Sequence, residues 1–110
     1  MTITTIPETS YAARVSALLD DATKEWRKKD YVAAEKLCRE ARALAAEHIG
    51  RDSRAYGYCL EDLGIILVAM NSLDEAREVL GEALCVMEKE LGSRAPEVER
   101  IFGRLHDLYH

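Results

Sequence analysis

The stretch LEDLGIILVAMNSLDEAREVLGEA, residues 60–83, decides the fold because its small and large apolar residues recur at helical intervals on both sides of the Asn71-Ser72 turn. The pattern is repeated at a constant spacing of 42 residues, as from Ala34 to Ala76. The matching pairs are Leu18 with Leu60, Asp20 with Asp62, Ala34 with Ala76, Glu40 with Glu82, Ala41 with Ala83, Gly50 with Gly92, and Leu63 with Leu105. A repeat of this period predicts a solenoid of stacked helix pairs.

The size and composition indicate one modest all-helical domain. The chain has 110 residues, of which 48% are apolar and 32% charged, and only two prolines and six glycines interrupt it. Such a length supports a single hydrophobic core. We expect a flexible N-terminal arm over residues 1–9 and a single helical domain over residues 10–110.

The charge pattern argues against a nucleic-acid partner. The formal net charge is −5, and acidic and basic residues alternate along the chain. Phosphate binding needs a basic stripe. The longest basic run, Arg27-Lys28-Lys29, falls where a helix should end. There its positive charges interact favourably with the negative end of the helix dipole.

Cysteine usage and the start of the chain predict a cytoplasmic protein. Cys38, Cys59 and Cys85 are odd in number and form no C-x-x-C pair, so we expect reduced thiols. All three fall at or beside apolar helical positions, where a free cysteine acts as a small apolar residue. The first six residues lack the basic start and long apolar stretch of a secretory signal. No segment is apolar for long enough to cross a bilayer, so no membrane partner is expected.

Hydrophobic periodicity predicts five helices. Their approximate ranges are 11–27, 31–49, 53–70, 73–91 and 96–109. Asp30 is placed to cap the second helix, and Ser72 with Glu75 matches a capping box for the fourth. Pro96 suits the first turn of the fifth helix.

The inward faces of the helices follow from the same spacing. On the first helix we expect an apolar stripe of Tyr11, Val15, Leu18, Ala22 and Trp26, and on the fifth one of Val98, Ile101, Phe102, Leu105 and Tyr109. The third helix should bury Tyr56, Cys59, Leu60, Leu63, Gly64 and Leu67. Small residues such as Ala22, Ala34, Gly64 and Ala76 would let paired helices approach closely.

This arrangement of large and small residues resembles the tetratricopeptide repeat (TPR). The packing positions of that family are matched by Leu18, Ala22, Trp26, Tyr31, Ala34, Cys38 and Ala41, and again by Leu60, Leu63, Gly64, Leu67, Leu73, Ala76, Leu80 and Ala83. The 42-residue spacing and the phrase LGSRAPEV, residues 91–98, look like the longer repeats of kinesin light chains. The resemblance implies a right-handed α-α superhelix of five antiparallel helices: two full pairs and a C-terminal capping helix.

The resemblance also implies where a partner would bind. In the family, the first helix of each pair lines a concave groove that holds a peptide or a helix of another protein. Mapped onto this chain, the expected partner-binding residues are Leu19, Thr23, Tyr58, Asp62, Ile65, Arg100 and Arg104. Leu19, Tyr58 and Ile65 would be apolar anchors, and the two arginines could receive an acidic side chain. Some members of the family bind the terminal carboxylate of chaperone tails through basic and polar groove residues. Asp62 occupies one of these positions and would repel that carboxylate, so we do not expect a chaperone tail as the partner.

The sequence is also compatible with other functions. Two and a half repeats are few for this fold, so the chain could instead be a structural subunit that forms homo-oligomers through exposed repeat ends. A small secretion-type chaperone is a further alternative. We expect no enzyme, because the acidic pairs Asp20-Asp21, Glu61-Asp62 and Asp74-Glu75 are adjacent and diverge on a helix.

No cofactor or metal is expected either. His106 and His110 are spaced i, i+4 on the last helix, a geometry that can hold a metal ion from one face. No third ligand accompanies them, and the spacing lacks the glutamate of the metalloprotease motif. Glycine-rich phosphate loops and nucleophile motifs are also absent from the sequence.

Overall fold

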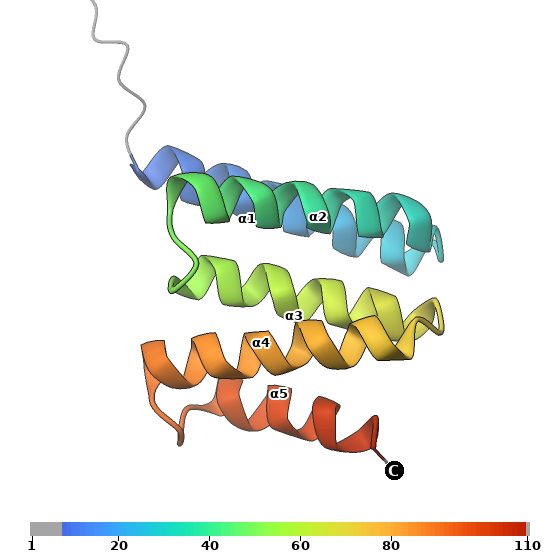
Figure 1. Cartoon of the computed structure of the whole chain (residues 1–110). Coiled ribbons are helices and arrows are strands. Elements are labelled where there is room, and N and C mark those ends of the chain that lie inside the picture. The colour runs from blue at the N-terminus through green and yellow to red at the C-terminus, as the bar shows by residue number, and fades with distance from the viewer. Residues whose placement is uncertain (1–7, 110) are drawn as a thin grey trace, which may run out of the picture.

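Five antiparallel α-helices make up the fold in the computed structural model, which describes residues 8–109 (Figure 1). Their bounds are α1 Glu8–Arg27, α2 Tyr31–His48, α3 Arg54–Ala69, α4 Leu73–Leu91 and α5 Pro96–Asp107. The helices pack in chain order, α1 on α2 and α3 on α4 as hairpins, with α5 against α4. α1 also contacts α3, as the first helices of successive solenoid units should. The predicted TPR-like solenoid is confirmed.

The start of the chain is partly described. α1 begins at Glu8, so most of the predicted arm over residues 1–9 lies outside the described residues. Within the described part, none of the helices combines the length and the apolar composition that crossing a membrane requires.

Side-chain caps fix two helix starts. The Asp30 carboxylate accepts a hydrogen bond from the Ala33 N–H at 3.1 Å, as predicted, and the Ser53 hydroxyl accepts one from the Tyr56 N–H at 3.1 Å. Each cap satisfies a backbone donor that the first turn leaves without a partner. Gly92 ends α4 with a φ of +90°, a conformation that favours glycine.

The predicted capping box of α4 is wrong. Ser72 precedes α4 but makes no side-chain hydrogen bond to it. Glu75 instead accepts a hydrogen bond of 2.8 Å from Arg39 on α2, which is itself bonded to Glu35. The charge-assisted bond between hairpins is the stronger interaction, so it takes the carboxylate that the sequence assigned to the cap.

The core consists of small residues facing large ones. Ala34, Ala41, Ala76 and Ala83 are fully buried, as are the larger Leu60, Leu63, Leu67 and Leu80. A Cβ atom added to Gly64 would lie 2.5 Å from the Leu80 side chain, closer than carbon atoms can approach. The predicted need for a small residue at this contact between α3 and α4 is therefore confirmed.

Several residues assigned to apolar stripes are exposed instead. Trp26 is 40% exposed, Phe102 59% and Tyr109 67%, whereas Val98 and Ile101 are buried as expected. α5 is the outermost helix of the described residues, so only the side that meets α3 and α4 is covered. Periodicity alone predicts more buried residues than the structure has, because it does not show how many neighbouring helices cover a given helix.

The three cysteines do not share one environment. Cys38 and Cys59 are buried, and burial raises the pKa of each thiol to about 12. Cys85, however, is exposed on α4, so it does not act as a small apolar residue of the core. Its position places the side chain on the solvent side of α4, opposite the buried Ala83 and Met87 row.

Candidate functional site

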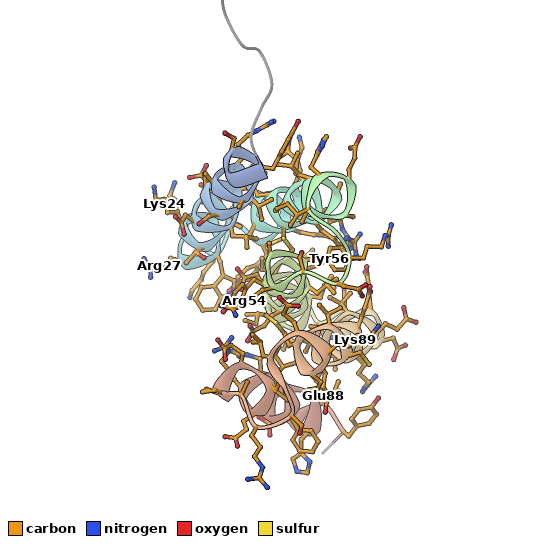
Figure 2. The ribbon with its side chains drawn as sticks, turned by 90° about the vertical axis from the view of Figure 1, so that its left-hand side faces the viewer. Lys24, Arg27, Arg54, Tyr56, Glu88 and Lys89 are labelled. Carbon is orange, nitrogen blue, oxygen red and sulfur yellow. The ribbon has the colours of Figure 1, made fainter. Side chains whose placement is uncertain are left out.

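One side of the molecule is lined by α1, α3 and α5. Figure 2 looks nearly along the helices and shows α1 and α5 toward one side, with α3 set back between them. Arg27 of α1 marks this side, and Lys89 of α4 lies on the opposite one. The first helices of the pairs therefore form the recessed side, as the repeat architecture requires.

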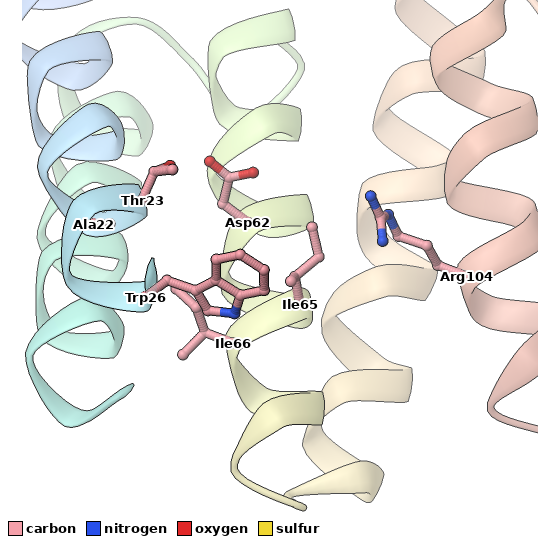
Figure 3. Close-up of a pocket in the computed structure, with 7 residues that line it drawn as sticks. All are labelled: Ala22, Thr23, Trp26, Asp62, Ile65, Ile66 and Arg104. Atoms are coloured by element: carbon pink, nitrogen blue, oxygen red, sulfur yellow. The ribbon is translucent and has the colours of Figure 1, made fainter. Parts of the chain in front are cut away.

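Two adjoining pockets occupy this side, and together we call them the concave cleft. The first, the Trp26 pocket, has a volume of about 290 Å³ and is shown in Figure 3. It is lined by Ala22, Thr23, Trp26, Asp62, Ile65, Ile66 and Arg104. The second, the Tyr58 pocket, has a volume of about 270 Å³. It is lined by Ala12, Val15, Ser16, Leu19, Asp20, Ala55, Tyr58 and Asp62.

The cleft brings together six of the seven residues expected to bind a partner. Leu19 and Tyr58 line the Tyr58 pocket, and Thr23, Ile65 and Arg104 line the Trp26 pocket. Asp62 lines both pockets. Arg100, the seventh, lines neither of them.

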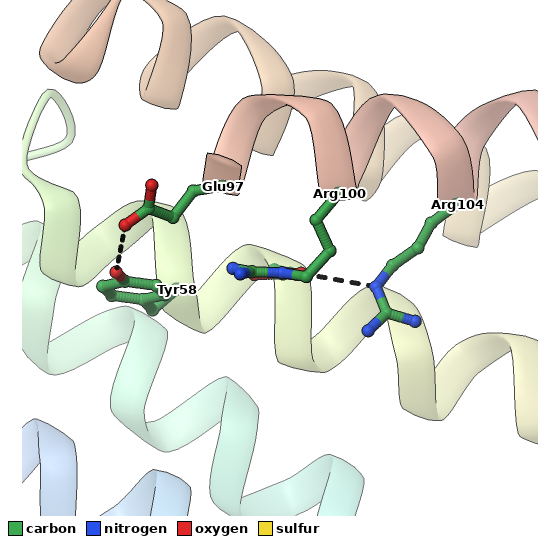
Figure 4. Close-up of polar contacts among 5 residues, drawn as sticks. Tyr58, Glu97, Arg100 and Arg104 are labelled. Atoms are coloured by element: carbon green, nitrogen blue, oxygen red, sulfur yellow. Dashed lines mark hydrogen bonds and ion pairs between the residues drawn. The ribbon is translucent and has the colours of Figure 1, made fainter. Parts of the chain in front are cut away.

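Arg100 is engaged within the chain. Its Nε and Nη2 atoms donate to the two carboxylate oxygens of Glu61 at 2.6 and 2.7 Å, and Arg104 Nε donates to the same carboxylate at 3.3 Å (Figure 4). The Glu61 side chain is only 4% exposed. A buried carboxylate needs such partners to offset the loss of its hydration. The two arginines therefore neutralise Glu61 of their own chain, a partner that the sequence analysis did not assign to them.

Asp62 follows Glu61 directly but has a different environment. It is partly buried, and no hydrogen bond or ion pair joins its carboxylate to another residue in the range 8–109. Burial, with Glu61 and Asp20 nearby, raises the pKa of Asp62 to about 6, and Arg100 and Arg104 oppose the rise. The cleft therefore holds an uncompensated carboxyl group where its two pockets meet.

Two hydroxyl groups of the cleft, those of Tyr58 and Thr23, already donate hydrogen bonds within the chain. The Tyr58 hydroxyl donates to Glu97 on α5 at 3.3 Å, and the Thr23 hydroxyl donates to the Leu19 carbonyl at 3.0 Å. Burial and the neighbouring Glu97 raise the pKa of Tyr58. These bonds fix both side chains, so the cleft has a preformed shape on its α1 and α3 walls.

Sequence reasoning missed Trp26 and Glu61. Trp26 was assigned to the packing stripe, but it sits in the last turn of α1, where its ring projects beside Ile65 and Ile66 of α3 (Figure 3). From the sequence, Glu61 is treated only as one of an adjacent acidic pair, although Arg54, Glu61 and Asp62 are the only charged residues of α3. An acidic residue in a helix that is mostly buried indicates an ion pair, because a buried carboxylate needs a cation from another helix.

The residues that the structure describes contain no cluster of three or more His, Cys, Asp or Glu side chains able to hold a metal ion. The His106 ring is stacked on Phe102 with ring centroids 6.3 Å apart. His110, its predicted companion, lies outside the described residues. The cleft offers apolar surface, the carboxyl groups of Asp20 and Asp62, and two hydrogen-bonded hydroxyls, and such groups can recognise a partner.

Comparison with known proteins agrees with this architecture. The family model described as "Tetratricopeptide repeat" matches residues 22–89, which is more than half of the chain. Protein KINESIN LIGHT CHAIN-RELATED 3 of Arabidopsis thaliana is 29% identical over 59 residues, covering 54% of this chain and 9% of that protein. This chain thus spans only a small part of that relative's length. TPR repeats generally mediate protein–protein interaction and are generally not catalytic. By its repeats, its fold and this match, the chain belongs to the tetratricopeptide repeat family.

Proposed function

We propose that this chain is a non-catalytic interaction module that binds a peptide or helix segment of another protein in the concave cleft. The observation that carries the proposal is the pair of adjoining pockets between α1 and α3, which share Asp62. The proposed contact residues are the six expected residues that line them, and Arg100 supports their arrangement through Glu61.

The dimensions of the cleft suit amino-acid side chains. The two pockets measure about 290 and 270 Å³, close to the lower end of the usual range of about 300–1,000 Å³ for small-molecule sites. Two neighbouring pockets of this size would receive two side chains of one segment. Such a partner would be held by several small contacts along the helices rather than by one deep cavity.

Trp26 is the strongest candidate anchor. It is 40% exposed and contributes to the Trp26 pocket beside the partly buried Ile65. Tryptophan is enriched among residues that dominate binding energy, and covering a large apolar side chain is worth about 1.5–3 kcal/mol. Leu19 would play the equivalent role in the Tyr58 pocket.

Affinity capture with paired variants tests the proposal. Leu19→Asp combined with Ile65→Asp places charges in both pockets, whereas Val32→Asp changes a residue on α2 that is 70% exposed and lines neither pocket. Proteins captured by the native chain should be lost with the double variant and kept with Val32→Asp. Circular dichroism verifies that both variants fold. Unchanged capture by the folded double variant would refute cleft binding.

A second candidate is a structural subunit that forms homo-oligomers. Phe102 on α5 and Tyr109 just after this helix are exposed, and a second copy could cover them. Light scattering over a wide concentration range separates the two functions. A strictly monomeric species would exclude self-assembly, whereas a dimer lost in Phe102→Ser would support it.

The proposed setting is a single domain over residues 10–110 in the reducing cytoplasm. Cys38 and Cys59 are free thiols inside the core, which supports a reducing compartment. Fluorescence microscopy of the tagged chain in its native cell would test the location directly. Signal confined to an oxidising compartment would contradict it.

A further inference from the structure

The two adjacent carboxylates of α3, Glu61 and Asp62, differ in their ion-pair partners. Glu61 receives Arg100 and Arg104, with N–O distances of 2.6 and 3.3 Å. Asp62 lies one residue further on, lines both pockets, and receives no hydrogen bond or ion pair from the described residues. A partly buried carboxylate without a partner is costly, and a binding partner that supplied a cation would remove this cost.

The local charge balance favours a cation over an anion. The carboxylates at this place are Asp20, Glu61 and Asp62, and the facing cations are Arg100 and Arg104, which makes three negative charges against two positive ones. The described lining of the Tyr58 pocket includes both aspartates but no lysine or arginine. Arg104 lines the Trp26 pocket, but its Nε atom is bonded to Glu61.

We infer that the segment bound in the cleft carries a lysine or arginine whose cation pairs with Asp62, and a large apolar side chain that enters the Trp26 pocket beside Ile65. The inference rests on the proposed function and specifies the chemistry of the partner. It reverses the expectation from the sequence, in which Arg100 and Arg104 would receive an acidic side chain.

The spacing within the partner follows from α3. Asp62 and Ile65 are three residues apart on this helix, a rise of about 4.5 Å at 1.5 Å per residue. A helical partner matches this distance with a basic and an apolar residue three or four positions apart. The Tyr58 ring, which lines the same pocket as Asp20 and Asp62, offers a face for the cation.

Peptide selection tests the inference on the full chain. The probe is a phage library displaying random 12-residue peptides, selected on the immobilised native chain and on Asp62→Asn. Native selections should be enriched in lysine or arginine three or four positions from a large apolar residue. Selections on Asp62→Asn should keep the apolar residue and lose the basic one.

Affinities of one selected peptide then isolate the charge pair. By fluorescence anisotropy, Asp62→Asn should weaken binding about tenfold, which corresponds to about 1.4 kcal/mol. Asp21→Asn is the matched control, because Asp21 neighbours Asp20, is exposed, and lines neither cleft pocket. It should leave the affinity within about twofold. A peptide with glutamine in place of its basic residue should bind the native chain and Asp62→Asn equally.

The outcomes separate this inference from the proposed function. Enrichment of acidic residues, or equal affinity of basic peptides for the native chain and Asp62→Asn, would overturn the inference alone, provided that binding still requires Leu19 and Ile65. Selected peptides that bind the folded Leu19→Asp/Ile65→Asp variant unchanged would overturn the proposed function and the inference together. A failure to select any peptide would count against both.

Discussion

The Arg100 guanidinium holds the buried Glu61 carboxylate through two hydrogen bonds of 2.6 and 2.7 Å, which joins α5 to α3. Arg100→Gln should therefore destabilise the fold, because it leaves Glu61 with only Arg104. We expect a loss of about 2 kcal/mol in urea unfolding, less than the about 3–5 kcal/mol of a fully buried pair because Arg100 is 42% exposed. Glu61→Gln combined with Arg100→Gln should recover part of this loss. A single variant as stable as the native chain would contradict the assigned role.

Two glycines in neighbouring helices should respond oppositely to alanine. In Gly64→Ala the new Cβ would lie 2.5 Å from the Leu80 side chain, so we expect a loss of about 1–3 kcal/mol. At Gly81 on α4 a Cβ would meet nothing within 4 Å, and Gly81→Ala should gain about 0.5–1 kcal/mol from helix propensity. Urea unfolding measures both. Equal effects at the two sites would argue against the close α3–α4 contact.

Asp62 should make stability fall as pH rises from about 4 to about 6. The pKa of Asp62 is raised from 3.8 to about 6 in the folded chain, so in this interval the folded state holds a proton that the unfolded state has lost. The contribution of Asp62 to the free energy of unfolding is therefore largest below about pH 4 and decreases as the pH rises through about 6. Above that pH it no longer changes. The charged or titratable groups near Asp62 are Asp20 on α1, Cys38 on α2, Cys59 and Glu61 on α3, and Arg100 and Arg104 on α5.

Asp62→Asn should remove this decline and stabilise the chain at pH 7.5. The shift corresponds to at most about 3 kcal/mol, and partial exposure of Asp62 reduces the expected gain to about 1–2 kcal/mol. Thermal unfolding at several pH values measures it, with Asp21→Asn as the control that keeps the native profile. A less stable Asp62→Asn at pH 7.5 would show that the carboxylate supports the fold instead of opposing it.

Thiol reactivity should distinguish Cys85 from the other cysteines. Cys85 is exposed, whereas Cys38 and Cys59 are buried with pKa values of about 12. A colorimetric disulfide reagent should therefore modify one thiol in the native chain and three after unfolding in urea. Cys85→Ser should abolish the rapid reaction. Rapid modification of more than one thiol in the folded chain would contradict the packing of α2 against α3.

Periodicity and small residues were enough to predict the helices and their packing. The spacing of Ala34, Ala76 and Gly64 with large apolar partners specified both hairpins, because close helix approach requires small side chains at fixed positions. The start of α2 was likewise readable from Asp30. These features depend on a single helix or on two helices that follow each other in the chain. The spacing of residues in the sequence therefore specifies them directly.

The ion-pair partners between helices, and the exposure of residues at the edges of the solenoid, could not be predicted from the sequence. Glu75 bonds Arg39 and Glu61 bonds Arg100, and both choices depend on the register between helices that are distant in sequence. Trp26 was misjudged for a related reason, since a helical stripe shows which residues could be covered but not where the neighbouring helix stops covering them. Six of the seven expected cleft residues nevertheless line the two pockets, and their role stays a prediction.

Site-specific photo-crosslinking tests the cleft most directly. A photoreactive residue would replace Ile65 in the cleft or Val32 on the exposed side of α2, and each chain would be irradiated with a bound peptide selected on the native chain. Cleft binding predicts a strong adduct from position 65 and none from position 32. An adduct from position 32, with none from position 65, would contradict the account.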